Sequence, residues 1–143
     1  MGGNAFTSGP EALRTPRMNP STYFVQRDHY IVLLRSLYYD VGTPIEAPCK
    51  TSFGDLDFLV SNPISEEPSK DAIATYLHAA RRTTGPNPTT SYAVPCPNSP
   101  SSFVQIDIHR CSTKSYKWQL FHQSHGGMWA SPSPFIQGFH KRC

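Results

Sequence analysis

The stretch Lys50–Val60, KTSFGDLDFLV, places two aspartates, Asp55 and Asp57, at alternate positions directly before an apolar run. In a strand, side chains two positions apart point to the same face, so these carboxylates would stand side by side, roughly 7 Å apart at their backbones. Like charges on one face cost free energy unless a cation neutralises them or water solvates them. The stretch therefore predicts a strand from Asp55 to Ser61 that begins at a metal site or at a solvated turn.

Length and composition favour a small, loop-rich domain. The chain has 143 residues, of which 38% are hydrophobic, and it contains 14 prolines. The formal net charge of +3 is too weak, and the Lys and Arg residues are too scattered, to indicate a nucleic-acid surface by electrostatics alone. The sequence shows no CxxC pair, no signal-peptide core and no apolar run approaching the ~20 residues of a membrane helix. We therefore expect an intracellular chain with no membrane partner.

Hydrophobic periodicity predicts helices on both sides of the aspartate strand. Apolar residues at helical spacing predict a helix from Ser21 to Tyr38 and a second helix from Ser69, as its cap, to about Arg82. The arginine pair Arg81–Arg82 would then interact favourably with the dipole at the end of the second helix. Between the first helix and the strand, the two prolines of GTPIEAPCK predict an extended loop.

The second half of the chain predicts an antiparallel hairpin. Its strands are Ser91–Val94 and Phe103–His109, separated by a long, proline-rich loop over Pro95–Pro100. In the second strand, three apolar residues alternate with Gln105, Asp107 and His109, so Asp107 lies on the polar face. The following segment, SYKWQLFHQSH, is ambiguous between helix and strand, and its aromatic spacing favours a helix.

Asp55, Asp57 and Asp107 are the candidate catalytic and metal-binding residues. Two aspartates on one strand and a third on a neighbouring strand supply the hard oxygen ligands that a two-magnesium phosphoryl-transfer site requires. One metal would activate a hydroxyl, and the other would hold a triphosphate. The alternative is a turn that enters a strand with its acids solvated, which is the commoner meaning of Gly-Asp-x-Asp in an arbitrary sequence.

Several motifs resemble one superfamily. SFGDLDFLV resembles the GDxD signature of the polymerase-beta nucleotidyltransferase superfamily, and VQIDIHRC resembles its later strand with the third acid. More specifically, six pieces resemble, in the same order, fungal proteins with nucleotidyltransferase-like domains, across roughly residues 2–126. The pieces are GGNAF, TPRM, PIEAPCKTSFGDLDFLV, SYAVP, VQIDIHRC and WQLFHQSHG.

The resemblance implies an α/β (α+β) fold over residues 1–126, with a small mixed sheet, flanking helices on one face and the carboxylates at the edge of the sheet. An irregular tail would follow over residues 127–143. Asp55, Asp57 and Asp107 would bind Mg²⁺. We also expect Gly54 and Lys50 to contact a nucleoside triphosphate, Lys50 as a point charge for phosphate, although a lysine just before a strand is more often an ordinary solvated residue. The reaction would transfer a nucleoside monophosphate to a hydroxyl acceptor on a nucleic acid or a protein.

The sequence also departs from the superfamily pattern. The turn that grips the triphosphate usually carries Gly-Ser or Gly-Gly, and here Gly42–Thr43 is a degenerate version. Gly2-Gly3-Asn4 could supply these glycines in a rearranged order, although a flexible terminus is the simpler expectation. Beyond Gly126 the resemblance stops, as after a frameshift or a lost exon, so we expect a truncated chain. These departures leave open a catalytically inactive domain that serves as a binding or interaction module.

A third class of function is a small zinc-stabilised module. Its ligands would come from His109, Cys111, His122 and His125. The spacing matches no common structural zinc pattern, and a zinc site usually brings paired ligands at both ends.

Overall fold

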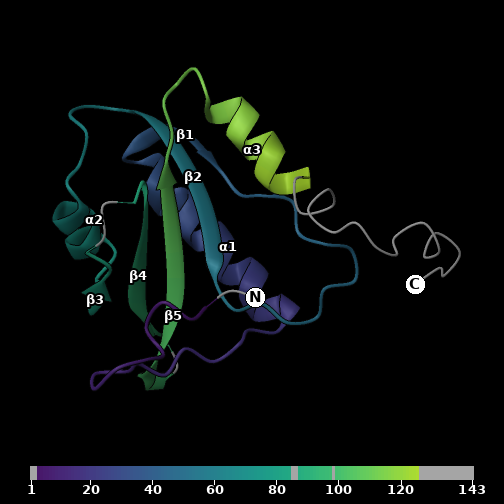
Figure 1. The fold of residues 1–143 in the computed structure, drawn as a ribbon, viewed down its shortest axis with the longest axis vertical. Helices are drawn as coiled ribbons and strands as arrows, with labels where there is room; N and C mark the ends of the chain where they lie inside the picture. The colour runs from purple at the N-terminus through teal and green to yellow at the C-terminus, as the bar shows by residue number, and fades with distance from the viewer. Residues whose placement is uncertain (1–2, 85–86, 98, 126–143) are drawn as a thin grey trace, which may run out of the picture.

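The aspartate stretch leads into a central strand of a mixed sheet (Figure 1). This computed structural model describes residues 3–84, 87–97 and 99–125. Within them the elements are α1 (Pro20–Arg35), β1 (Tyr38–Gly42), β2 (Leu56–Pro63), α2 (Lys70–Tyr76), β3 (Arg81–Arg82), β4 (Thr89–Cys96), β5 (Ser99–Arg110) and α3 (Tyr116–His125).

The sheet has the strand order β1-β2-β5-β4-β3. Strands β2 and β5 run parallel at its centre, and every other neighbouring pair is antiparallel. The expected α/β (α+β) class with a small mixed sheet is confirmed. Asp57 and Asp107, however, lie on the two central strands and not at the edge of the sheet, and Asp55 lies one residue before β2.

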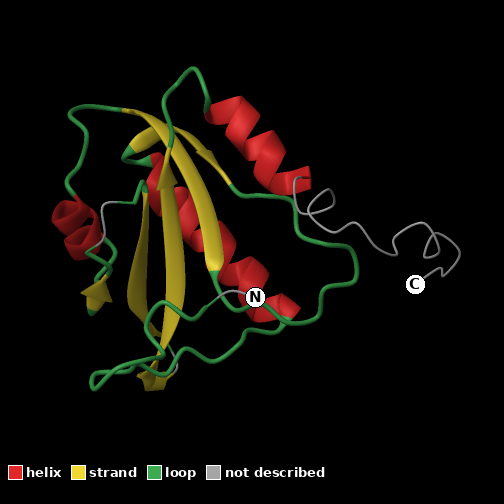
Figure 2. Ribbon diagram, viewed as in Figure 1, coloured by secondary structure: helices red, strands yellow, loops and turns green. Residues whose placement is uncertain are grey.

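Helices cover both faces of the sheet, which corrects the expectation of helices on one face (Figure 2). Helices α1 and α2 share the main core with the apolar side chains of the central strands, including Phe58 and Ile106. Helix α3 lies on the opposite face, where Gln119 bonds to His109 of β5. None of the helices in the described ranges has the length and apolar character needed to cross a membrane.

The first predicted helix is three residues too long. Asn19 caps α1 by accepting a hydrogen bond from the amide of Thr22 at 2.8 Å, and Pro20 fits the first turn. At the other end, Ser36 bonds to the carbonyl of Leu33, and the chain then enters β1 at Tyr38. Strand β1 was missed because its first residue continues the helical spacing of apolar residues.

The second predicted helix is also too long. Ser69 caps α2 as expected, accepting from the amide of Ala72 at 3.0 Å. The helix ends at Tyr76, and His78 follows with a left-handed φ of 54°. Arg81–Arg82 form β3 against β4, so the interpretation of this pair as a helix-dipole interaction is wrong.

The predicted antiparallel hairpin of β4 and β5 is confirmed, but the prediction of a long loop over Pro95–Pro100 is wrong. Strand β4 continues through Pro95, which pairs with Phe103, and Cys96 pairs with Ser99. The other neighbour, β3, pairs with β4 only at Tyr92 and Ala93. A proline on the open side of a strand removes no ladder hydrogen bond, so Pro95 is tolerated there.

The predicted helix over SYKWQLFHQSH is confirmed as α3. The expected irregular tail over residues 127–143 and the expected truncation lie outside the described residues. The division into residues 1–126 and a tail therefore stays a prediction.

Candidate metal site

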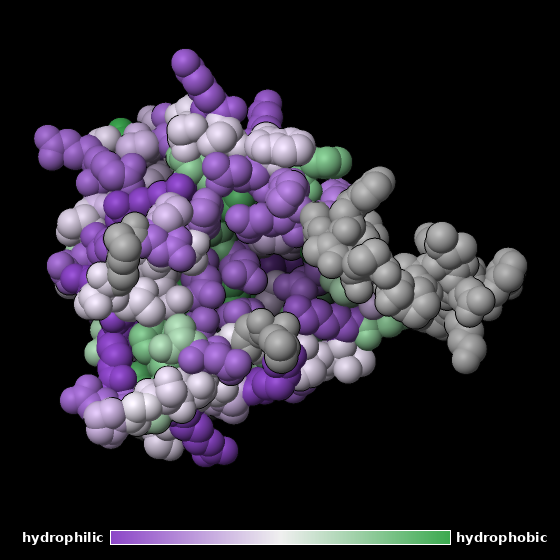
Figure 3. Space-filling view, viewed as in Figure 1, coloured by the Kyte–Doolittle hydropathy of each residue, from purple (hydrophilic) through white to green (hydrophobic). Residues whose placement is uncertain are grey.

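The fold brings the three predicted aspartates together. Asp57 of β2 and Asp107 of β5 are register partners on parallel strands, and Asp55 lies one residue before β2. One carboxylate oxygen from each residue lies within 4.8 Å of the others, and no other group of three or more potential metal ligands gathers within residues 3–84, 87–97 and 99–125. The face of the molecule seen in Figure 3 is hollowed near its centre, with hydrophilic residues around the hollow.

Burial of the alternate residues fixes where these carboxylates point. Leu56 and Phe58 of β2 are fully buried in the core, and Ile106 and Ile108 of β5 are buried beside them. Because side chains alternate along a strand, Asp57 and Asp107 must project from the opposite face. The hydrophobic core therefore sets the orientation of the polar site.

The electrostatics of the cluster disfavour three free negative charges. Burial, and then the neighbouring Asp55 and Asp107, raise the pKa of Asp57 to about 7. Burial also raises the pKa of Asp107, partly offset by hydrogen bonds from Ser91 and Gln105. None of the ion pairs in the described part of the chain involves these three aspartates. Oxygen ligands with excess negative charge are the donor set that a hard divalent cation requires.

Neutral hydrogen-bond donors approach two of the three carboxylates. The amide of Gly3 donates to Oδ2 of Asp55 at 2.8 Å, and the side-chain amide of Gln105 donates to both oxygens of Asp107, at 3.0 and 3.1 Å. Gly3 is buried, so the expectation of a flexible terminus at this residue is wrong. Sequence reasoning missed both donors, although the GGNAF motif and the polar face of β5 contain them.

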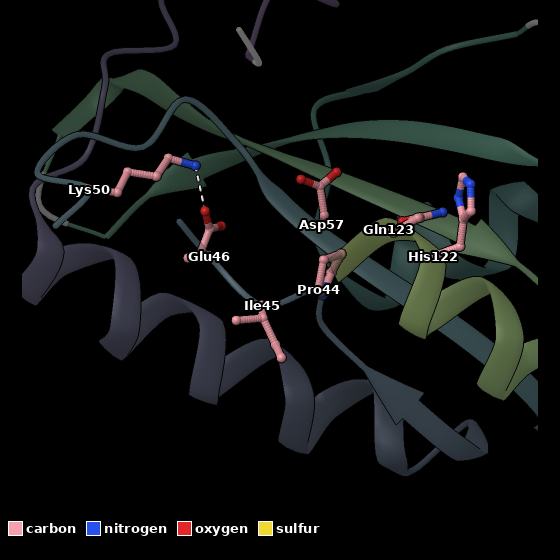
Figure 4. Close-up of a pocket in the computed structure, with 7 residues that line it drawn as sticks. All are labelled: Pro44, Ile45, Glu46, Lys50, Asp57, His122 and Gln123. Atoms are coloured by element: carbon pink, nitrogen blue, oxygen red, sulfur yellow. Dashed lines mark hydrogen bonds and ion pairs between the residues drawn. The ribbon is translucent and has the colours of Figure 1, made fainter. Parts of the chain in front are cut away.

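A pocket of about 450 Å³ opens beside Asp57 (Figure 4). Its lining combines the loop after β1 with α3: Pro44, Ile45, Glu46, Lys50, Asp57, His122 and Gln123. The ammonium group of Lys50 bonds to Oε2 of Glu46 at 2.5 Å, and the hydroxyl of Tyr23 donates to the other oxygen at 2.7 Å. Lys50 therefore lines the pocket, and its expected contact with a nucleoside triphosphate stays a prediction. His122, a candidate zinc ligand in the sequence, is a lining residue instead, and Gln123 beside it was not predicted to belong to a site.

Gly54 and Gly42, the two glycines that the sequence offered for contact with a nucleotide, are each packed against another segment of the chain. Gly54 is buried against Gly3, and its proposed contact with a nucleotide stays a prediction. Gly42 lies under α3, where an added Cβ would come within 2.6 Å of the Tyr116 hydroxyl. The amide of Ile45, three residues on, donates to the hydroxyl of Ser124 in α3 at 3.0 Å. Helix α3 therefore covers the Gly42–Thr43 turn.

The histidines and cysteine of the zinc hypothesis do not come together in the described part of the chain. Both ring nitrogens of His109 are engaged, by Thr89 at 2.7 Å and by Gln119 at 2.8 Å. The thiol of Cys111 also bonds to Gln119, at 3.1 Å. These residues join β5 to α3 by hydrogen bonds.

Comparison with sequence-family profiles and with curated proteins finds no match. Among solved structures, the chain is similar to the polymerase beta of Leishmania infantum in a crystal structure described as a ternary gap complex, with a TM-score of 0.55 and 12% sequence identity. The match covers 76% of this chain and 42% of that chain, so the chain spans less than half the length of this neighbour. The likeness shows a nucleotidyltransferase-like fold.

Proposed function

We propose that this chain is a magnesium-dependent nucleotidyltransferase domain, which transfers a nucleoside monophosphate from a nucleoside triphosphate to a hydroxyl acceptor. The observation that carries this proposal is the convergence of ligand atoms of Asp55, Asp57 and Asp107 within 4.8 Å, on and just before the central strands of a nucleotidyltransferase-like fold. A solvated turn would leave the third acid, which lies 50 residues further along the chain than Asp57, apart from the pair.

The three residues fit a divalent cation by their chemistry. They offer only oxygen ligands, they are held by strand backbone, and no cation of the described chain pairs with them. Bound magnesium would neutralise charge that develops on the phosphoryl oxygens during transfer. The chain itself would contribute the orientation of the carboxylates, which the strand backbone sets for Asp57 and Asp107.

The pocket beside Asp57 supplies room for the triphosphate of a nucleotide. Lys50 would exchange its bond to Glu46 for a phosphate oxygen, which an ammonium group binds as a point charge. The acceptor hydroxyl would belong to a nucleic acid or a protein. An intracellular location belongs to this proposal, because the reaction consumes nucleoside triphosphates.

A second candidate is a catalytically inactive domain of the same fold that acts as a binding module. The cover of α3 over Gly42 and the bond between Ile45 and Ser124 favour it, because the amide of Ile45 is already satisfied within the chain. A phosphate would have to displace Ser124 to bind that amide.

Nucleotide transfer by the purified chain distinguishes the two candidates. Each labelled nucleoside triphosphate is incubated with Mg²⁺ or Mn²⁺ and with oligonucleotide or protein acceptors. We expect transfer that requires the metal, is lost in Asp57→Asn and is retained in Asp28→Asn, which changes the same charge on α1. Metal binding without transfer to any acceptor would favour the inactive module, and absence of metal binding would overturn the proposed site.

A further inference from the structure

The segment before α1, residues 3–18, is anchored at both ends on the turn that leads to the metal-binding pair. At its start, Gly3 bonds to Asp55. At its end, Met18 forms a two-way backbone bridge with Phe53, with N–O distances of 2.7 and 2.9 Å. We call this segment the N-terminal strap. Phe6, only 3% exposed, holds the strap against the body of the domain.

The strap also reaches the third carboxylate through one intermediate side chain. The amide of Ala5 donates to Oε1 of Gln105 at 2.9 Å, and the Nε2 group of Gln105 donates to both oxygens of Asp107. Gln105 is only 3% exposed, so little water can replace these bonds. Two amides of the strap therefore act on two carboxylates: that of Gly3 directly on Asp55, just before β2, and that of Ala5 through Gln105 on Asp107 of β5.

The two hydrogen-bond donors to the carboxylates, the Gly3 amide and the Gln105 side chain, carry no charge, so they leave the negative charge of the site available to a cation. A lysine or arginine beside the aspartates would cancel the charge that attracts a cation. An amide N–H restrains the orientation of a carboxylate and leaves its charge in place. Without the two donors, mutual repulsion would turn the carboxylates of Asp55 and Asp107 apart toward water, and metal binding would have to draw them together again.

We propose that the N-terminal strap braces the metal site, with the Gly3 amide positioning Asp55 and with Gln105 as a positioning residue for Asp107. This inference rests on the proposed function, because it assigns the strap to the same metal site. The strap is then part of the machinery that sets metal affinity, even though it contributes no ligand.

The backbone of Gly3 provides a selective way to displace the brace. Its φ of +84° lies in the left-handed region, and an added Cβ would lie 2.3 Å from the carbonyl oxygen of Gly54, which cannot move aside easily. Gly9 also has a left-handed φ, +91°, but an added Cβ there meets nothing within 4 Å. Gly3→Ala and Gly9→Ala thus introduce the same kind of backbone strain, and only Gly3→Ala pushes the strap away from Asp55.

The experiment measures Mn²⁺ binding to the full chain, by the electron paramagnetic resonance signal of free Mn²⁺, for Gly3→Ala, Gly9→Ala, Gln105→Met and Gln26→Met. Methionine fills a similar volume but donates no hydrogen bond, and Gln26 lies on α1 outside the cluster. Loss of a residue that orients a metal ligand typically weakens metal binding by about 10-fold or more. We expect that loss for Gly3→Ala and Gln105→Met, with affinity near that of the unmodified chain for both controls.

Urea unfolding without metal separates positioning from general damage. A positioning role predicts that Gly3→Ala and Gln105→Met lose Mn²⁺ affinity beyond what their loss of folding stability, compared with the controls, explains. Equal Mn²⁺ affinity in all five proteins would overturn the brace and leave the proposed function standing. If the unmodified chain binds no Mn²⁺, the proposed function itself fails. If Gly3→Ala does not fold, Gln105→Met decides, because it keeps the buried volume.

Discussion

Asp57 and Asp107 are register partners on the parallel strands β2 and β5, so the backbone itself sets the distance between them. Neighbouring strands lie about 4.8 Å apart, which places two carboxylates on one face within reach of a single cation. A register shift of one residue would send one of the two into the core. The site is therefore a consequence of how the sheet is assembled.

Replacing Asp107 with Asn removes one like charge and keeps the shape of the side chain. We expect the metal-free protein to gain a little stability, because the repulsion between neighbouring carboxylates falls. We also expect the rise in melting temperature on addition of Mg²⁺ to disappear, because that rise comes from binding to the folded state alone. Thermal unfolding with EDTA and with excess Mg²⁺ measures both effects.

The matched control for this change is Asp28→Asn, which removes an exposed acid of α1 that pairs only with Arg27 among the described ion pairs. It should keep the Mg²⁺-dependent shift. A shift of equal size in Asp107→Asn and in the unmodified chain would mean that magnesium stabilises the protein at some other place.

The metal-free protein should lose stability as the pH rises toward neutrality. Asp57 has its pKa raised from 3.8 to about 7 in the folded state, mainly by burial, so the folded chain holds a proton that the unfolded chain has released. Stability then falls with pH between these two values and levels off above the higher one. Unfolding in urea with EDTA, at several values from about pH 4 to about pH 8, measures this slope.

In Asp57→Asn that slope should be reduced, because the amide does not titrate. Asp107, whose pKa is also raised, contributes in the same direction and leaves part of the slope in place. An unchanged slope in Asp57→Asn would show that other groups cause the pH dependence.

The polar face of the central strands could be predicted from sequence because strand alternation is a short-range rule. Leu56, Phe58, Ile106 and Ile108 mark the buried face, and this places Asp57 and Asp107 on the other. That β2 and β5 are neighbours, however, is not contained in either stretch. The superfamily resemblance supplied that expectation, and the sheet order confirms it.

Other features depended on contacts between distant segments, which local patterns do not reveal. Arg81–Arg82 follow a helical stripe, yet pairing with Tyr92 and Ala93 makes them a strand. Gly3 looked like part of a loose terminus, and its partner Asp55 lies 52 residues away. The lining of the pocket by α3 likewise results from tertiary packing over the loop after β1.

Substitution of Gly42 by Ala should weaken the contact between α3 and the turn after β1. The new Cβ would come within 2.6 Å of the Tyr116 hydroxyl and 2.9 Å of Leu120 Cδ2. Both atoms end side chains of α3, which has no buried residue and can shift, so we expect a loss of about 1 kcal/mol, the lower end of the range for overpacking. Urea unfolding measures the loss, which should be smaller when Tyr116→Phe is added, because the phenolic oxygen is gone.

The single change Tyr116→Phe completes this double-mutant cycle. Additive losses, with no recovery in the double variant, would contradict the close packing of Tyr116 on Gly42.

Lys50→Met tests whether the pocket beside Asp57 binds a triphosphate. The ammonium group of Lys50 now bonds to Glu46 and lies 4.8 Å from the centre of the Phe53 ring, so the charge is held at the pocket without an aspartate partner. Hydrogen bonds to charged groups contribute about 1.5–3 kcal/mol, which corresponds to a loss of roughly 10-fold or more in nucleotide affinity. Mn²⁺ binding without nucleotide should stay unchanged or tighten, because the positive charge of Lys50 lowers the pKa of Asp57 but also repels a cation.

The measurement is calorimetric titration of a non-hydrolysable nucleoside triphosphate in the presence of Ca²⁺, beside a separate titration of Mn²⁺ alone. Lys114→Met is the control, because Lys114 is exposed and lies before α3, outside the pocket lining. Equal loss of nucleotide affinity in both variants would mean that only the overall charge of the protein matters. If Lys50→Met leaves nucleotide affinity intact, Lys50 is an ordinary partner of Glu46, and the triphosphate must bind elsewhere on the face that carries the three aspartates.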